Sequence, residues 1–239
     1  MIVGVLLAAG ASRRMGSPKA LARTRGESFL ARGVRNLWSV CDRVVVVLGS
    51  HADQVRAGAE REFQGLVARN RLAEDLAAAR RRTGLRGSAR AGRGASARGA
   101  GRLEVRFVVH RGWRQGMLSS ARAGLRAGLA GSPEALLLAP VDHPAVRART
   151  AADLGVVLLA ALASIPSPRD RARFAYALVP RHRRRRGHPV ALTPALARAV
   201  VADRAAADLS DAIRRHARLV GYLDVSDAGV VRNRNTPRD

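Results

Sequence analysis

The chain has 239 residues, of which 47% are hydrophobic and only 3% aromatic, a composition that suits one large α/β domain with a core of Ala, Val and Leu. Its formal net charge is +25, but 42 of its 43 basic residues are arginine, a bias typical of codon composition spread over a surface, so a nucleic-acid partner is disfavoured. The single cysteine excludes an internal disulfide, and the longest apolar run, near 154–165, is too short to span a bilayer. We therefore expect a cytoplasmic protein with no membrane partner.

The first fifty residues predict a strand, a helix and a second strand. Ile2 to Ala8 is a short apolar run, and because no basic segment precedes it, it indicates a buried parallel strand instead of a signal peptide. A helical pattern follows from about Ser28 to Val40, and Arg43 to Leu48 (RVVVVL) is a second buried strand. These elements form a βαβ unit, whose crossover should be right-handed.

The amino-acid composition changes in the middle of the chain. Residues 52–82 permit a helix, but from about 80 to 102 the sequence contains Arg, Gly, Ser and Ala with almost no large apolar side chain. Such a segment cannot bury enough surface to offset the entropy lost on ordering, so a disordered insertion is expected. An RNA-binding arginine–glycine segment is the alternative, disfavoured because aromatic residues are missing from it.

Strand and helix patterns alternate through the rest of the chain. Further strands are predicted at Leu103–Val109, Ala135–Ala139, Phe174–Val179 and Leu219–Val225, with helices at Gln115–Ala130, Thr150–Ser164 (capped by Thr150), Pro194–Ala202 and Leu209–Ala217, and a basic loop at Pro180–Arg186. The alternation predicts an α/β fold with a doubly wound, mostly parallel sheet. We expect a single domain over residues 1–239, interrupted by the insertion at about 80–102.

A glycine-containing loop follows the first strand, where ligands of such sheets bind. Gly10 and Gly16 allow the backbone to approach a bulky anion, and successive N–H groups there can form an anion-binding nest. Ser12 adds a hydroxyl, and Arg13 and Lys19 add charges suited to phosphate oxygens. The loop matches neither a Walker A motif nor the G-x-G-x-x-G fingerprint. Lys19 is also the only lysine of the chain, and an ammonium is not equivalent to a guanidinium at a phosphate.

The fifteen residues from Leu7 to Leu21, LAAGASRRMGSPKAL, resemble the signature loop of the MobA-like nucleotidyltransferases. The resemblance implies a Rossmann-like, nucleotide-diphospho-sugar transferase-like fold, and it is nearest to the molybdenum cofactor cytidylyltransferases. It implies that the loop binds the triphosphate of a nucleotide and that Lys19 and Arg13 act in catalysis. The nucleotide-binding residues implied in this loop are Leu7, Ala8, Ala9, Gly10, Ser12, Arg13, Gly16 and Lys19.

A carboxylate follows the predicted strand Ala135–Ala139. Asp142 would lie at the carboxyl end of that strand, and Mg²⁺ is commonly held by one or two carboxylates together with substrate phosphates. The stretch LLLAPVDHP also resembles the second motif of the same family, in which the matching acid binds the metal. The tail resembles the family's D-x-D-T-P-E-D ending, with Asn235 in the place of a second metal-binding acid. Asn235 is therefore a weaker second ligand or a structural turn residue.

Two further segments resemble parts of the family that lie near the nucleotide and the acceptor. Trp113 to Leu125 matches the W-x-x-G-M segment, in which Ser119 and Ser120 either cap a helix or contact the base or ribose. Gly187 and His188 match an element near the acceptor pocket of cofactor cytidylyltransferases. The arginines of Arg183–Arg186 either bind an acceptor phosphate or form a solvated loop.

These features together predict a Mg²⁺-dependent nucleotidyltransferase, and Mg²⁺ is its expected cofactor. Its expected substrates are a nucleoside triphosphate, with CTP favoured, and a phosphorylated acceptor such as molybdopterin, with pyrophosphate released. A molybdoenzyme or its chaperone is a candidate partner. The alternatives are a guanylyltransferase of the same pathway, a sugar-phosphate nucleotidyltransferase, an Arg-rich nucleic-acid-binding protein and a cofactor-maturation chaperone.

Overall fold

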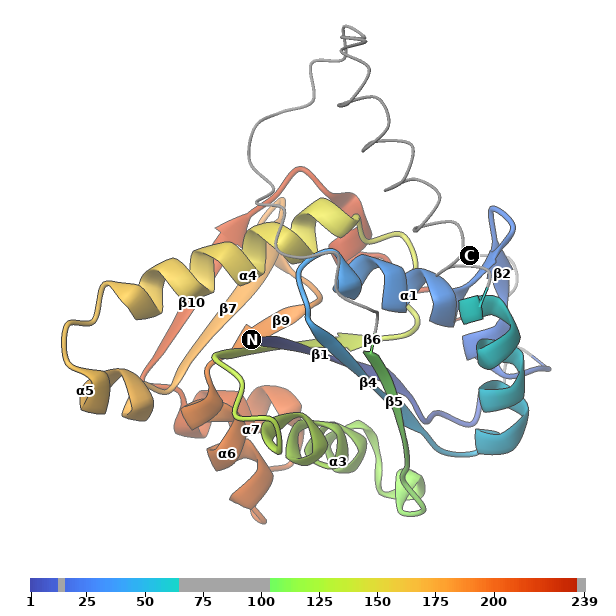
Figure 1. The fold of residues 1–239 in the computed structure, drawn as a ribbon, viewed down its shortest axis with the longest axis horizontal. Helices are drawn as coiled ribbons and strands as arrows, with labels where there is room; N and C mark the ends of the chain where they lie inside the picture. Colours follow the sequence, from blue (N-terminus) through green and yellow to red (C-terminus); the bar gives the residue numbers. More distant parts are fainter. Residues whose placement is uncertain (13–15, 65–103, 236–239) are drawn as a thin grey trace, which may run out of the picture.

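A large, mostly parallel sheet forms the centre of the computed structural model, which describes residues 1–12, 16–64 and 104–235 (Figure 1). The central strand β1 (Ile2–Ala8) pairs in parallel with β4 (Arg43–Leu48) on one side and with β6 (Ala135–Pro140) on the other. The predicted insertion at about 80–102 lies outside the described residues.

The sheet has eight strands, in the order β10-β7-β9-β6-β1-β4-β5, with β8 paired to β7. The outer strands are β5 (Glu104–Val109), β7 (Tyr176–His182), β8 (Arg185–Arg186), β9 (Val190–Leu192) and β10 (Leu219–Asp224). Because the short β9 runs antiparallel to both β6 and β7, these two longer strands run parallel to one another. The carboxyl ends of β1, β4, β6, β7 and β10 therefore meet at one edge of the sheet.

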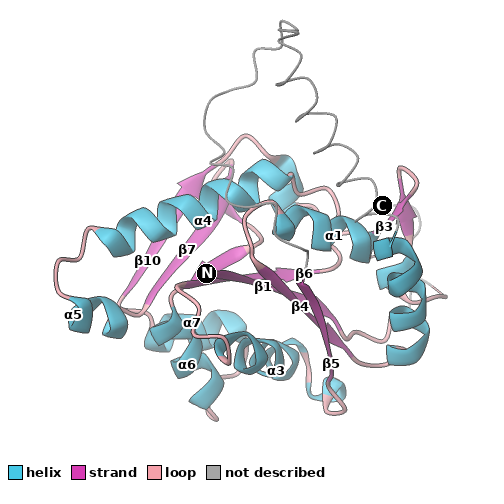
Figure 2. Ribbon diagram, in the orientation of Figure 1, coloured by secondary structure: helices cyan, strands magenta, loops and turns pink. Residues whose placement is uncertain are grey.

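Helices cover both faces of the sheet, as the ribbon in Figure 2 shows. One face carries α1 (Phe29–Trp38), a helix at 52–64 and α4 (Ala148–Ala163); the other carries α3 (Met117–Leu129), α6 (Pro194–Ala202) and α7 (Leu209–His216). The short α5 (Pro168–Arg173) follows α4, and a hairpin of β2 (Arg23–Thr24) and β3 (Glu27–Ser28) precedes α1. Three 3₁₀ turns complete the described elements: η1 (Lys19–Leu21), η2 (Trp113–Gln115) and η3 (Ala228–Val231).

The alternation of side chains along each central strand fills two separate cores. In β1, Ile2, Leu6 and Ala8 belong to the core beneath α1 and α4, whereas Val3 and Val5 belong to the core beneath α3 and α6. Since both faces are buried, the strand is apolar throughout, as expected for a parallel strand in such a sheet. The two cores are filled mainly by Ala, Val and Leu, in agreement with the low aromatic content of the chain.

The predicted fold class is confirmed, and several local predictions need correction. Thr150 does not cap α4: the helix begins at Ala148 after Arg147, and the Thr150 hydroxyl donates to the carboxylate of Asp227. The predicted basic loop is instead the end of β7 and the strand β8. The short strands β2, β3 and β9 and the helix α5 were not predicted, because two to six residues carry too little periodicity to be recognised.

Within the described residues, no helix is both long enough and apolar enough to cross a membrane.

Candidate active site

A cavity of about 410 Å³ opens at the carboxyl ends of β1 and β6. The loop after β1 forms one wall, the segment from η2 to the start of α3 forms another, and the residues after β6 form the third. The lining residues are Leu7, Ala8, Ala9, Gly10, Ala11, Ser12, Lys19, Ala20, Trp113, Arg114, Gly116, Met117, Ser120, Pro140, Val141 and Asp142. Three segments far apart in the chain thus meet where an open α/β sheet binds its ligands.

The loop after β1 is shaped by backbone geometry and one hydroxyl. Ser12 has a φ of 53° and Gly16 a φ of 66°, both in the left-handed region, so the chain turns sharply on either side of the undescribed residues 13–15. The Ser12 hydroxyl accepts a hydrogen bond from the backbone N–H of Lys19 at 2.8 Å. Gly10 borders open space, where a side chain would meet no atom within 4 Å. Gly16 is exposed and does not line the cavity, and Arg13 lies outside the described residues.

The ammonium of Lys19 lies between two predicted metal ligands. Its Nζ is 3.4 Å from Oδ2 of Asp142 and donates to Oδ1 of Asn235 at 2.6 Å. The side chains of Lys19 and Asp142 are 17% and 22% exposed, so the pair is partly shielded from water. The oxygens of Asp142 and Asn235 thus converge on one cation, and oxygen ligands of this kind are those that Mg²⁺ takes together with substrate phosphates.

The tail reaches this point through a buried carboxylate that sequence reasoning missed. Asp227 accepts hydrogen bonds from the backbone of Arg147, the hydroxyl of Thr150 and the backbone of Gly229, and so fixes the turn η3 against the start of α4. A Cβ at Gly229 would lie 2.3 Å from a backbone oxygen, so the chains approach too closely for a side chain there. The backbone N–H of Arg234 then donates to the carbonyl of Asp142 at 2.8 Å, which places Asn235 beside Lys19.

The second wall corrects the predicted capping role of two serines. Helix α3 begins at Met117 with Gly116 as its N-cap, and no side chain caps it. The Ser119 hydroxyl donates to the carbonyl of Gly116 at 2.8 Å and lies 3.0 Å from Nε2 of His110, and Ser119 does not line the cavity. Ser120 is buried and lines the cavity. Of the two serines, Ser120 is therefore the one placed to contact a ligand.

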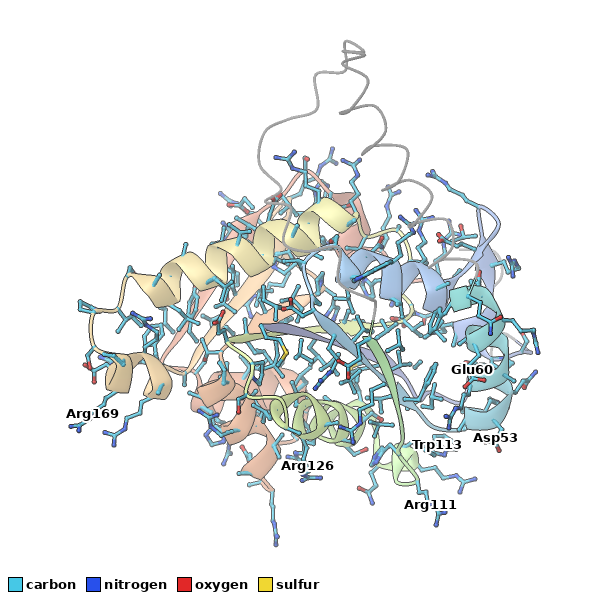
Figure 3. The ribbon with its side chains drawn as sticks, viewed as in Figure 1. Asp53, Glu60, Arg111, Trp113, Arg126 and Arg169 are labelled. Atoms are coloured by element: carbon cyan, nitrogen blue, oxygen red, sulfur yellow. The ribbon has the colours of Figure 1, made fainter. Side chains whose placement is uncertain are left out.

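Trp113 and Arg114, like Gly116 and Met117 of the same wall, were not among the predicted site residues. Trp113 and Arg114 line the cavity, and the Arg114 guanidinium lies 4.9 Å from the centre of the Trp113 ring. Figure 3 shows Trp113 at the turn that follows β5. The W-x-x-G-M resemblance already placed this segment near the nucleotide, so the sequence held a signal for both residues. Ala20 and Val141, which also line the cavity, likewise lie within the two segments that resemble family motifs, the loop Leu7–Leu21 and the stretch LLLAPVDHP.

Two histidines pack beside Asp142 on the side away from the cavity. The rings of His143 and His188 are 5.0 Å apart in an edge-to-face arrangement, and Nε2 of His143 is 3.9 Å from Oδ1 of Asp142. Burial lowers the pKa of His143, an effect that the charge of Asp142 partly opposes. Burial, with a smaller contribution from His143, lowers the pKa of His188 to about 4. Both imidazoles are therefore neutral at pH 7 and carry no charge for a phosphate.

The predicted acceptor element is held mainly by backbone contacts. The backbone N–H of Gly187 donates to Pro180, and that of His188 donates to the carbonyl of Val230 at 2.9 Å. A Cβ at Gly187 would lie 2.3 Å from the Val230 oxygen, so this position requires glycine. Gly187 and His188 do not line the cavity at β1 and β6, and the ring of His188 packs against that of His143, the residue after Asp142.

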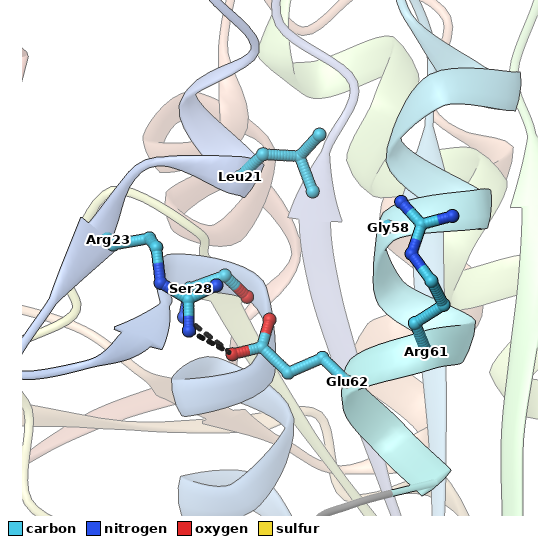
Figure 4. Close-up of a pocket in the computed structure, with 6 residues that line it drawn as sticks. All are labelled: Leu21, Arg23, Ser28, Gly58, Arg61 and Glu62. Atoms are coloured by element: carbon cyan, nitrogen blue, oxygen red, sulfur yellow. Dashed lines mark hydrogen bonds and ion pairs between the residues drawn. The ribbon is translucent and has the colours of Figure 1, made fainter.

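A second cavity of about 410 Å³ lies between the β2–β3 hairpin and the helix 52–64 (Figure 4). Its carboxylate, Glu62, accepts the backbone N–H of Ser28 at 2.9 Å and lies 3.7 Å from the guanidinium of Arg23. Glu62 thus joins the helix to the hairpin. None of the predicted site residues lines this cavity, so the candidate active site is the cavity at β1 and β6.

Known proteins match both the sequence and the fold. The family model described as MobA-like NTP transferase domain matches residues 4–64 and 90–219. The curated protein nicotine blue oxidoreductase of Paenarthrobacter nicotinovorans is 30% identical over 238 residues, covering 95% of this chain and 88% of that protein.

Two solved structures share the fold at lower identity. A nucleotidyl transferase from Methanothermobacter thermautotrophicus is 18% identical with a TM-score of 0.64, covering 100% of this chain and 94% of that one. Rv0371c of Mycobacterium tuberculosis H37Rv, in complex with manganese, is 19% identical with a TM-score of 0.54. The match covers 94% of this chain and 88% of that one. The family model covers well over half of the chain, and the residues that it matches include the wall-forming segments around Lys19, Trp113 and Asp142. The chain belongs to the MobA-like NTP transferase family.

Proposed function

We propose that this chain transfers a nucleoside monophosphate from a nucleoside triphosphate to a phosphorylated acceptor and releases pyrophosphate. One observation carries the proposal: a glycine-containing loop, a lysine and a carboxylate meet in one cavity at the carboxyl ends of β1 and β6. The loop supplies backbone donors for the phosphates, Lys19 supplies a positive charge, and Asp142 supplies a hard oxygen ligand. CTP is the favoured nucleotide and a molybdopterin-type phosphate the favoured acceptor, both on family resemblance.

The residues present fit a divalent cation. Asp142 and Asn235 already direct oxygens at a common cation, the Lys19 ammonium, and would hold the ion when a nucleotide is bound. The ion, Mg²⁺ in this proposal, would neutralise charge on the phosphates. That a structural neighbour was solved with manganese supports a divalent metal in this fold.

The chain's own residues account for the remaining chemistry by positioning and electrostatics. An oxygen of the acceptor phosphate attacks the α-phosphorus in line, the bond to the bridging oxygen breaks, and pyrophosphate leaves with the electron pair. Lys19, with Arg13, stabilises the charge that develops on the leaving oxygens. The acceptor phosphate is already anionic, so no side chain has to remove a proton. The neutral histidines beside Asp142 agree with this assignment.

The test begins with thermal unfolding in the presence of CTP, GTP, ATP or UTP, each with and without Mg²⁺. A ligand that binds only the folded state raises the apparent stability by RT ln(1 + [L]/Kd). We expect the largest, magnesium-dependent rise with CTP. A larger rise with GTP would favour guanylyl transfer, and nucleotide binding without pyrophosphate release from any acceptor would favour a maturation chaperone.

Lys19→Ala tests the catalytic assignment. Turnover should fall by roughly a hundredfold or more, on the scale of losing one preorganised donor at a developing charge. Arg126→Ala, which removes an exposed arginine of α3 outside the cavity, is the control and should keep wild-type turnover. Pyrophosphate release is the measurement. A loss below about threefold in Lys19→Ala would contradict the role of the lysine.

A second candidate follows from the curated relative, whose name describes an oxidoreductase. The observation that favours it is Asn235, because an amide replaces the second acid of the family's ending and, among the described residues, leaves Asp142 as the only carboxylate lining the cavity. In this alternative the loop after β1 would hold the pyrophosphate of a dinucleotide that donates a hydride to an aromatic dye. Oxidation of NADH or NADPH in the presence of such a dye, without pyrophosphate release, would support this candidate over nucleotidyl transfer.

A further inference from the structure

The side chain of Lys19 occupies the position where the two predicted metal ligands converge. Its ammonium is 2.6 Å from Oδ1 of Asn235 and 3.4 Å from Oδ2 of Asp142. The ammonium lies at the point where these two oxygens converge, and a magnesium ion that bound both of them, at its usual ligand distance of about 2.0–2.1 Å, would need that same position. Lys19 must therefore leave the two oxygens before a metal can bind them.

The surrounding protein offers a free divalent ion little else. Among residues 1–12, 16–64 and 104–235, no three side chains of His, Cys, Asp or Glu gather as a metal site would require. The charge of Asp142 is already balanced by Lys19, and Asn235 contributes an amide without charge. A metal arriving alone would therefore displace one cation and gain a single carboxylate in return.

The geometry lets Lys19 move without any change of the backbone. Its N–H is fixed by the Ser12 hydroxyl, its carbonyl accepts the N–H of Ala22, and Ala20 beside it is buried. Only the flexible four-carbon stem has to rotate. The same cavity contains the loop Gly10–Ser12, where a triphosphate would place negative charge within reach of the ammonium.

We propose that Lys19 acts as the resident counter-cation of the metal site and couples metal binding to triphosphate binding. In the empty enzyme the ammonium neutralises Asp142 and keeps metal affinity low. When a triphosphate binds, it attracts Lys19 and exposes the oxygens of Asp142 and Asn235 to the metal. The inference rests on the metal role given to Asp142 in the proposed function, and it predicts that metal and triphosphate strengthen one another's binding reciprocally.

Direct titration with Mn²⁺, followed by the signal of the free ion in electron paramagnetic resonance, tests this coupling without any turnover. Lys19→Met removes the charge and keeps an unbranched side chain only one atom shorter. A neighbouring charge at this distance shifts the affinity of a carboxylate for a proton by about one to three logarithmic units, so without nucleotide we expect Lys19→Met to bind Mn²⁺ roughly tenfold more tightly than wild type. Arg126→Met removes the same charge from the exposed face of α3 and should stay within about twofold of wild type.

A second titration adds inorganic tripolyphosphate as the probe. In wild type the Mn²⁺ affinity should rise strongly, whereas in Lys19→Met the rise should be much smaller. Lys19→Gln is the replacement if Lys19→Met unfolds, and Asp142→Asn should abolish the tight binding in either background. Equal or weaker Mn²⁺ binding by both uncharged variants without tripolyphosphate would overturn the proposal.

The result separates this inference from the proposed reaction. If wild type releases no pyrophosphate with any acceptor while Lys19→Met binds Mn²⁺ more tightly than wild type, the counter-cation is supported and the transferase is rejected. If wild type has full transferase activity while Lys19→Met binds Mn²⁺ no more tightly than wild type does, the counter-cation alone is rejected.

Discussion

At the scale of single residues, the lysine acquires a partner that no motif indicates. The sequence placed Lys19 in a phosphate loop and Asp142 after a strand, but their separation of 123 residues hid the contact between them. Ser12 is likewise predicted to bind phosphate, and its hydroxyl has a second contact that the motif does not indicate, because it accepts the backbone N–H of Lys19. A motif predicts which residue types meet a ligand, and it does not predict how they hold one another before the ligand arrives.

Ser12→Ala tests this internal contact. Loss of the acceptor leaves the Lys19 N–H unpaired in a partly buried loop, which costs about 1 kcal/mol, or a roughly five- to tenfold weaker affinity for a Mg²⁺–nucleotide complex. Ser17→Ala, on the exposed part of the same loop, should bind as wild type does. Isothermal titration with CTP and Mg²⁺ measures both. Equal affinities of Ser12→Ala and Ser17→Ala would contradict the role assigned to Ser12.

His188 gives a prediction about pH. Burial lowers its folded pKa to about 4, below the usual value near 6.5, so between these values the unfolded chain binds more protons and stability rises with pH. The stabilisation is complete above pH 6.5 and is lost as the pH falls towards 4, by on the order of 2 kcal/mol. His143, whose pKa is also lowered, acts in the same direction.

Urea unfolding between pH 4 and 7 measures how steeply the free energy of unfolding rises with pH. His188→Asn should flatten this rise, whereas the exposed His51→Asn should leave it unchanged. A slope that is as steep in His188→Asn as in wild type would show that His188 is not the source.

At the scale of elements, prediction succeeded where burial alone determines the pattern. Apart from Arg43 at the start of β4, strands β1, β4 and β6 are apolar because both of their faces are covered, and their bounds were predicted almost to the residue. The antiparallel β9 was missed, because three buried residues between a proline and a helix cap resemble a loop. The turn η3 was missed because it depends on the distant contacts of Asp227, which local sequence does not encode.

The packing of α3 on the sheet gives the prediction at this scale. A Cβ at Gly124 would lie 2.4 Å from Cγ1 of Val5 and 2.7 Å from Cγ2 of Val47, two branched side chains of the buried sheet. Gly124→Val should therefore destabilise the protein by about 1–3 kcal/mol through overpacking. Arg126→Ala, two residues along the same helix and exposed, should change stability by less than about 0.5 kcal/mol. Denaturant unfolding compares them, and similar midpoints would show that α3 can shift outwards freely.

At the scale of the whole molecule, charge is distributed and not gathered at the site. The chain has 43 basic and 18 acidic residues, so at most 18 basic side chains can find an acidic partner of their own. Figure 3 labels Arg111, Arg126 and Arg169, which project from well-separated parts of the structure. This spread agrees with the reading of the arginine bias as compositional, and it implies repulsion among the folded protein's own charges.

Salt should therefore stabilise this protein. Raising NaCl from about 10 mM to 200 mM shortens the screening length from about 30 Å to below 10 Å, which weakens repulsion between surface arginines but leaves buried pairs nearly unchanged. We expect a higher midpoint of thermal unfolding in the higher salt, in wild type and Lys19→Met alike. Because repulsion is spread over the surface, removing one charge at the cavity cannot abolish the effect. If the salt-induced rise of the unfolding midpoint were absent in Lys19→Met, chloride binding near the lysine would explain the rise seen in wild type. The charge of the remaining surface would then contribute little to stability.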